Sequence, residues 1–126
     1  MKKIVLTTGG FDPLHSGHLA YFKAASKLGD ELWVGVNSDS WLARKKGRPF
    51  MCLDERIEII KNLRMVNNVF GFDDINDSAN NAISHVLNKT DKKDILILDF
   101  DDLRNDYKTV IKRIYDFIGI KEYVFA

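Results

Sequence analysis

Two of the three histidines in this 126-residue sequence, His15 and His18, stand close together around a glycine. They follow a short β-branched and apolar run that ends in Gly9 and Gly10. Glycine lets a bulky anion approach the main chain, and a helix starting near residue 16 would present free N–H groups to it. Imidazole groups at such a place can stabilise charge that develops during phosphoryl or nucleotidyl transfer. The pattern therefore predicts a phosphate site with two candidate catalytic histidines.

Two other interpretations of the histidine pair stay open. Histidines at this spacing can form half of a zinc site, although Cys52 is the single thiol and no third ligand stands at metal-like spacing. The pair could also consist of surface or core residues without a chemical role. The segment is neither a dinucleotide-binding fingerprint nor a P-loop, because it lacks the third phosphate-side glycine.

The rest of the chain predicts the elements that position this segment. Apolar, β-branched runs predict strands, and apolar residues at helical spacing predict helices. The expected strands cover residues 3–8, 31–37, 67–74, 94–100 and 121–126, and the expected helices cover 17–28, 54–65, 77–88 and 106–118. The basic segment 38–51 is expected to be a loop. Such alternation is typical of βαβ units around a parallel sheet, so we expect one α/β domain over residues 1–126.

Composition narrows the function classes. The 19 basic and 18 acidic residues give a net charge of +1, so there is no global field to hold nucleic acid or an anionic membrane, and we expect neither as a partner. The apolar run 4–6 is too short for a signal peptide, and no stretch approaches transmembrane length. Cys52 has no second cysteine with which to form an intrachain disulfide. We therefore expect a cytoplasmic protein.

The segments GGFDPLHSGHLAYFKAASKLGDELWVGVNSD and KKGRPFMCLDERIEIIKNLRMVNNV together resemble the cytidylyltransferase-like nucleotidyltransferases. This family includes glycerol-3-phosphate cytidylyltransferase, heptose-phosphate adenylyltransferase and phosphopantetheine adenylyltransferase. The likeness covers about residues 3–74 and implies a Rossmann-like, doubly wound parallel sheet with strand order 3-2-1-4-5. It also implies transfer of a nucleoside monophosphate from CTP or ATP to a phosphorylated sugar or polyol. Pyrophosphate would be released, Mg²⁺ would accompany the triphosphate, and a homodimer is expected.

The resemblance also implies roles for single residues. His15 and His18 would stabilise the transition state at the α-phosphate, and Lys46 would neutralise phosphate charge. The residues implied to bind the nucleotide are Thr8, Gly9, Gly10, Phe11, Asp12 and Arg56. Those implied to bind the acceptor are Asp39, Lys45 and Arg48, and no residue is assigned to a metal. Trp41 is expected at the rim of the pocket.

From about residue 91 the chain departs from the family pattern. The stretch DFDDLRND replaces the glycine-rich turn expected after the fourth strand, and the family's Ile-Ser-x-Thr-type motif is absent. Residues 95–120 are similar instead to a segment near the end of sulfotransferases, which we expect to act as scaffold. The acidic residues Asp99, Asp101 and Asp102 could still approach the crevice and assist a metal.

Three hypotheses about function follow. The chain is a nucleotidyltransferase, with glycerol-3-phosphate cytidylyltransferase as one specific form, or a nucleotide-binding protein without turnover, or a structural remnant within a larger assembly. Both histidines and the basic segment are retained, which favours the first.

Overall fold

The computed structural model describes residues 2–73, 82–87 and 90–119. Its strands are β1 (Ile4–Gly9), β2 (Glu31–Asn37), β3 (Asn68–Phe72) and β4 (Ile95–Asp99). Its helices are α1 (Ser16–Ser26), α2 (Asp39–Lys46), α3 (Leu53–Lys61), α5 (Phe100–Asn105) and α6 (Tyr107–Ile118), with a 3-10 turn, η1, at Lys92–Asp94. Within these described ranges, no helix is both long enough and apolar enough to span a bilayer.

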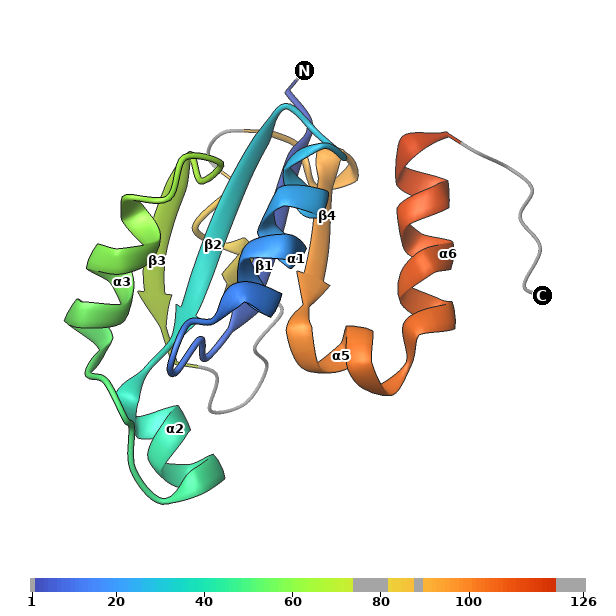
Figure 1. Ribbon diagram of the computed structural model, residues 1–126. Helices are drawn as coiled ribbons and strands as arrows, with labels where there is room; N and C mark the ends of the chain where they lie inside the picture. The colour runs from blue at the N-terminus through green and yellow to red at the C-terminus, as the bar shows by residue number, and fades with distance from the viewer. Residues whose placement is uncertain (1, 74–81, 88–89, 120–126) are drawn as a thin grey trace.

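The four strands form one parallel sheet in the order β3-β2-β1-β4 (Figure 1). β1 lies inside the sheet, where Leu6 pairs with Trp33 of β2 on one side and Ile97 of β4 on the other. The predicted α/β class and the order of the first four strands are therefore confirmed. The predicted fifth strand, residues 121–126, lies outside the described residues.

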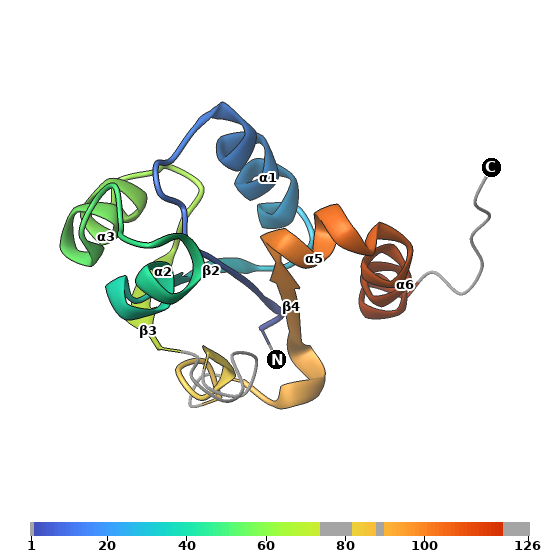
Figure 2. The ribbon, with the colours of Figure 1, turned by 90° about the horizontal axis from the view of Figure 1, so that it is seen from below.

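Alternate residues of β1 serve two different cores. Val5 belongs to a cluster that α1 covers with Phe22 and α6 with Val110. Ile4 and Leu6 point to the opposite face, where residues 82–87 pack against them. Figure 2 shows α1 and α3 on one side of the sheet and residues 82–87 on the other. Burial on both faces explains why β1 reads as a continuous apolar run.

Two helices differ from the sequence-based expectation. The segment 38–51 was predicted to be a loop, but α2 occupies Asp39–Lys46, because the Ser38 hydroxyl accepts a hydrogen bond from the N–H of Trp41 and caps the helix. α5 begins directly after β4, where the carboxylate of Asp99 accepts hydrogen bonds from the N–H groups of Asp101 and Asp102. Half of the predicted helix 77–88 lies outside the described residues. Both unpredicted helices stand at the carboxyl end of the sheet (Figure 1).

Candidate active site

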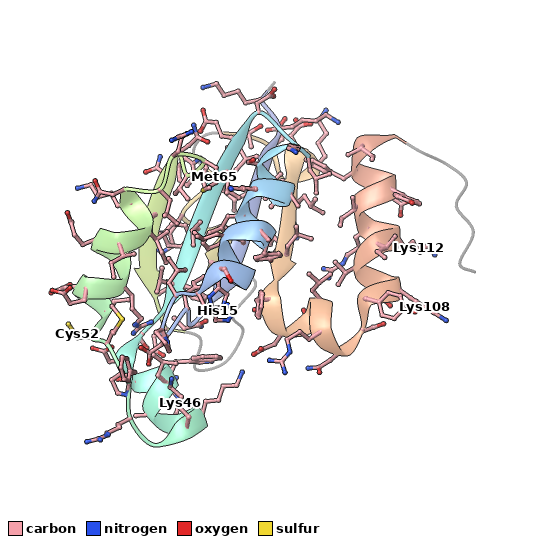
Figure 3. The ribbon with its side chains drawn as sticks, in the orientation of Figure 1. His15, Lys46, Cys52, Met65, Lys108 and Lys112 are labelled. Atoms are coloured by element: carbon pink, nitrogen blue, oxygen red, sulfur yellow. The ribbon has the colours of Figure 1, made fainter. Side chains whose placement is uncertain are left out.

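A cleft of about 280 Å³ lies beyond the carboxyl ends of β1 and β4. The loop after β1 forms its floor, and the start of α1 together with the helices α2 and α5 forms its walls. Its lining residues are Gly9, Gly10, Phe11, Asp12, His15, His18, Trp41, Leu42, Lys45, Lys46, Phe100, Asp101 and Arg104. In open α/β sheets this edge is where ligands bind. Figure 3 shows His15 and Lys46 at this end of the molecule.

The two histidines form a stacked pair at the start of α1. Their ring centroids lie 3.8 Å apart, with 28° between the ring planes. Nδ1 of His15 accepts a hydrogen bond from the N–H of Gly17 (3.0 Å), and Nδ1 of His18 accepts one from the N–H of His15 (3.1 Å). The pair thus acts as a capping box in which imidazoles take the places usually held by Ser/Thr and Glu/Gln.

These hydrogen bonds fix the tautomer of each ring. A neutral imidazole has one nitrogen that accepts and one that donates, and here both Nδ1 atoms accept from the backbone. The proton of each neutral ring therefore sits on Nε2. Each neutral ring thus offers an Nε2–H donor, and both residues line the cleft.

His18 is neutral at physiological pH. Its side chain is buried between Phe11, whose ring meets it edge-on at 5.1 Å, and Phe100, whose ring centroid lies 4.7 Å away. Burial chiefly, and the nearby ring of His15 in addition, lower the pKa of His18 to about 4. At neutral pH the ring therefore donates from Nε2 as an uncharged group.

The two glycines make room for packing around the cleft. A Cβ at Gly9 would lie 2.9 Å from Cζ of Phe11, and one at Gly10 would lie 2.9 Å from a methyl group of Leu42. Gly9 therefore lets the tip of the Phe11 ring approach the end of β1, and Gly10 lets α2 approach the loop. Phe11 itself adopts a positive φ of 51°, which turns its ring inward toward α1. Both glycines still line the cleft, as predicted.

Asp12 and Lys46 tie α2 and its following loop to the floor of the cleft. The carboxylate of Asp12 accepts hydrogen bonds from the N–H groups of Phe50 (2.6 Å) and Met51 (2.7 Å), and it pairs with Nζ of Lys46 at 2.9 Å. Burial alone would raise the pKa of Asp12, but these three donors together lower it. Nζ of Lys46 also donates to the carbonyl oxygen of Asp12 (2.8 Å).

Lys45 connects the two walls of the cleft. Its ammonium group forms an ion pair with Asp101 at the start of α5 and lies 4.6 Å from the centroid of a Trp41 ring. Trp41 lines the cleft, where the sequence predicted it. Because both Lys45 and Asp101 are partly exposed, this ion pair contributes little to stability and can exchange with an incoming anion.

The structure corrects the placement of Arg56, which does not line the cleft. Its side chain is buried and donates to the carbonyl oxygens of Met51 (2.9 Å), Gly10 (2.9 Å) and Asn37 (2.6 Å). Its remaining guanidinium nitrogen pairs with Asp39 at 2.7 Å. Arg56 therefore holds the loops after β1 and β2 together, and its donors are engaged by protein atoms. The paired carboxylate of Asp39 also stands apart from the cleft lining.

Two further predicted residues lie outside the cleft. The Thr8 side chain is buried, and its hydroxyl donates to the carboxylate of Asp99 at 2.8 Å, which joins the ends of β1 and β4. Arg48 lines a separate, shallower hollow with Lys46, Pro49 and Phe50. Because Lys46 borders both hollows, an acceptor bound at Arg48 would neighbour the cleft.

Sequence reasoning missed Leu42 of α2 and two further lining residues, Phe100 and Arg104, which both come from α5. Their segment was assigned to the end of a strand and a turn. The signal that could have located them is Asp99, an N-cap residue directly after a buried apolar run, followed by two more acidic residues. Asp101 was one of three acidic residues that could approach the crevice, and it does line the cleft.

Among residues 2–73, 82–87 and 90–119, no group of three or more His, Cys, Asp or Glu side chains is arranged to hold a metal ion. The two carboxylates of the cleft are already paired, Asp12 with Lys46 and Asp101 with Lys45.

The fold is Rossmann-like, with a parallel α/β sheet and a cleft lined by two histidines and two lysines next to the inner strand β1. A family model described as cytidylyltransferase-like matches residues 6–125. The chain therefore belongs to the cytidylyltransferase-like family, as its motifs predicted.

Individual relatives agree with this assignment. The chain is similar to the bifunctional protein HldE of Pseudomonas savastanoi pv. phaseolicola, with 40% identity over 98 residues that make up 76% of this chain and 19% of the relative. The corresponding protein of Campylobacter concisus is 41% identical over 98 residues, again 76% and 19% of the two chains. The chain thus spans about a fifth of the length of these curated relatives.

A solved structure matches more of its own length. The lipopolysaccharide core biosynthesis protein from Thermoplasma volcanium superposes with a TM-score of 0.60 and 25% sequence identity. The match covers 79% of this chain and 94% of that protein. The arrangement of strands and helices described above is therefore shared over most of that protein's length.

Proposed function

We propose that this chain transfers a nucleoside monophosphate from CTP or ATP to a phosphorylated sugar or polyol and releases pyrophosphate. The observation that carries the proposal is the pair of Nε2–H donors at the start of α1, held in place by Nδ1 bonds to the backbone. Family membership supports the same reaction class. The match to a lipopolysaccharide core biosynthesis protein favours a sugar phosphate as the acceptor.

The reaction needs no covalent intermediate on the protein. A phosphate oxygen of the acceptor attacks the α-phosphorus, a new phosphoanhydride bond forms, and the bond to the bridging oxygen of the β-phosphate breaks. The bonding electrons leave with pyrophosphate. Such a step is accelerated by positioning and by neutralising charge rather than by a nucleophilic side chain.

In this proposal each wall of the cleft has its own task. His15 and His18 donate from Nε2 to the oxygens of the α-phosphate, where negative charge increases in the transition state. Lys45 and Lys46 of α2 neutralise phosphate charge, after exchange of their present carboxylate partners. Arg48 receives the acceptor phosphate in the adjoining hollow. Mg²⁺ would enter the cleft bound to the nucleotide substrate. The sequence also predicts that the protein forms a homodimer, which light scattering can test.

The direct experiment is a pyrophosphate-release screen of four nucleoside triphosphates against a panel of sugar and polyol phosphates. Glycerol 3-phosphate belongs in the panel, because a strict preference for CTP and that acceptor would identify the narrower activity. Nucleotide binding without pyrophosphate release, for every pair tested, would favour the non-catalytic binding protein instead.

Two matched histidine variants test whether the Nε2–H donors at the start of α1 take part in catalysis. His18→Ala removes one donor and should lower kcat by about 100- to 1,000-fold, with nucleotide affinity changed far less. His85→Ala is the control, because His85 stacks on Phe70 with ring centroids 4.1 Å apart, away from the cleft lining. Equal activity of the two variants, with folding confirmed by circular dichroism, would remove the histidine pair from the mechanism.

A further inference from the structure

The cleft is lined by more lysine and arginine side chains than carboxylates. Three of its lining residues are basic and two are acidic. Lys46 is paired with Asp12, and Lys45 is paired with Asp101. The side chain of Arg104 has neither an ion pair nor a hydrogen bond within the part of the chain that the structure describes. The uncompensated positive charge of the cleft therefore belongs to Arg104.

α5 holds Arg104 at a fixed place relative to the histidines. The Asp99 carboxylate caps α5 through the N–H of Asp101 (2.9 Å), and the Phe100 ring packs on His18 at 4.7 Å. Side chains four residues apart share one face of a helix. Arg104 therefore lies on the face of α5 whose first residue contacts the catalytic pair, and both residues line the same cleft.

We propose that Arg104 binds the outer phosphates of the nucleoside triphosphate, the part that leaves as pyrophosphate; the identity of this anion rests on the proposed function. A phosphate can reach this guanidinium without breaking an ion pair, whereas Lys45 and Lys46 must first release a carboxylate. The guanidinium also offers a planar fork to two phosphate oxygens. In the proposed function the histidines at the start of α1 contact the α-phosphate. Arg104 on α5 would therefore contact the β- and γ-phosphates.

This assignment gives the divergent segment DFDDLRND a role in substrate binding. In that segment Asp99 is the helix cap, Phe100 is the contact to His18, and Arg104 is the anion ligand. The segment was expected to act as scaffold, yet it supplies the one cleft cation without a carboxylate partner among the described residues.

Calorimetric titration of the full chain with inorganic triphosphate, in the presence of Mg²⁺, tests the proposal without requiring turnover. Arg104→Ala should weaken binding by roughly 10- to 100-fold, as expected for loss of a charge-assisted contact, and Arg104→Lys should restore part of it. Arg64→Ala is the control, since it removes the same charge from an exposed residue outside the cleft lining. A parallel titration with CMP and AMP should show little change for Arg104→Ala.

Several results would overturn the proposal. These are an unchanged affinity of Arg104→Ala for triphosphate, an equal loss in Arg64→Ala, an equal loss of affinity for CMP and AMP, or no triphosphate binding by the unsubstituted chain. Failure of the pyrophosphate-release screen alone would instead refute the proposed function and leave triphosphate binding at Arg104 in place.

Discussion

Replacing His18 with glutamine should remove a specific part of the acid sensitivity of this protein. Glutamine is a usual partner at this position of a capping box, so its side-chain oxygen can accept the N–H bond of His15 that Nδ1 accepts now. It does not titrate. The variant therefore keeps the local hydrogen bond and deletes one ionisable group.

The size of the effect follows from the shift in pKa. The pKa of His18 is lowered from 6.5 to about 4, and each unit corresponds to about 1.4 kcal/mol. Between these two values the unfolded chain binds a proton that the native state does not, so the free energy of unfolding falls as the pH falls. The loss should reach about 3 kcal/mol near pH 4, a large fraction of the stability of a small domain.

Urea unfolding of both proteins at pH 7.5, 6, 5 and 4 measures this difference. For each protein, the change in the free energy of unfolding between pH 7.5 and each lower pH is calculated first. The difference between the two proteins then cancels the contribution of the carboxylates that both contain. Asp12 acts below this window, because its lowered pKa starts from 3.8. Parallel pH profiles for the original protein and His18→Gln would refute the assignment of His18 as a neutral, buried donor.

Two further substitutions test the frame around the cleft. Arg56→Met should lower the free energy of unfolding at pH 7 by about 3 kcal/mol, because three carbonyl oxygens and Asp39 lose their donor, and a urea midpoint equal to that of Arg64→Met would contradict the structural role of Arg56. Asp101→Asn should tighten binding of inorganic triphosphate without Mg²⁺ several-fold, because Lys45 is released from its partner, and weaker binding in calorimetry would contradict that reasoning.

Much of the fold could be predicted because the strands are buried on both faces. β1 and β2 read as continuous apolar runs, and α1, the helix between them, shows helical spacing of apolar residues. The two missed helices, α2 and α5, are short and lie at the carboxyl end of the sheet. They begin where Ser38 and Asp99 cap the backbone, and apolar periodicity does not mark them. A polar segment with four basic residues gives no periodic signal for α2.

The candidate site was predictable where residues are close in sequence and less so elsewhere. Gly9 to His18 form one continuous segment, so their shared location followed from the strand and helix on either side. Arg56 is different, because the family resemblance implied a nucleotide-binding arginine at this position but did not show what its side chain contacts. Its burial against carbonyl oxygens of two loops depends on how those loops meet in three dimensions.

The fate of radioactive phosphate tests the central claim most directly. The chain is incubated with an accepting sugar or polyol phosphate and with nucleotide labelled either at the α- or at the γ-phosphate. Nucleotidyl transfer predicts that the α-label appears in the acceptor product and that the γ-label appears in pyrophosphate. Both labelled products should form much more slowly with His18→Ala. Transfer of the γ-label to the acceptor, or release of labelled inorganic phosphate in place of pyrophosphate, would contradict the account.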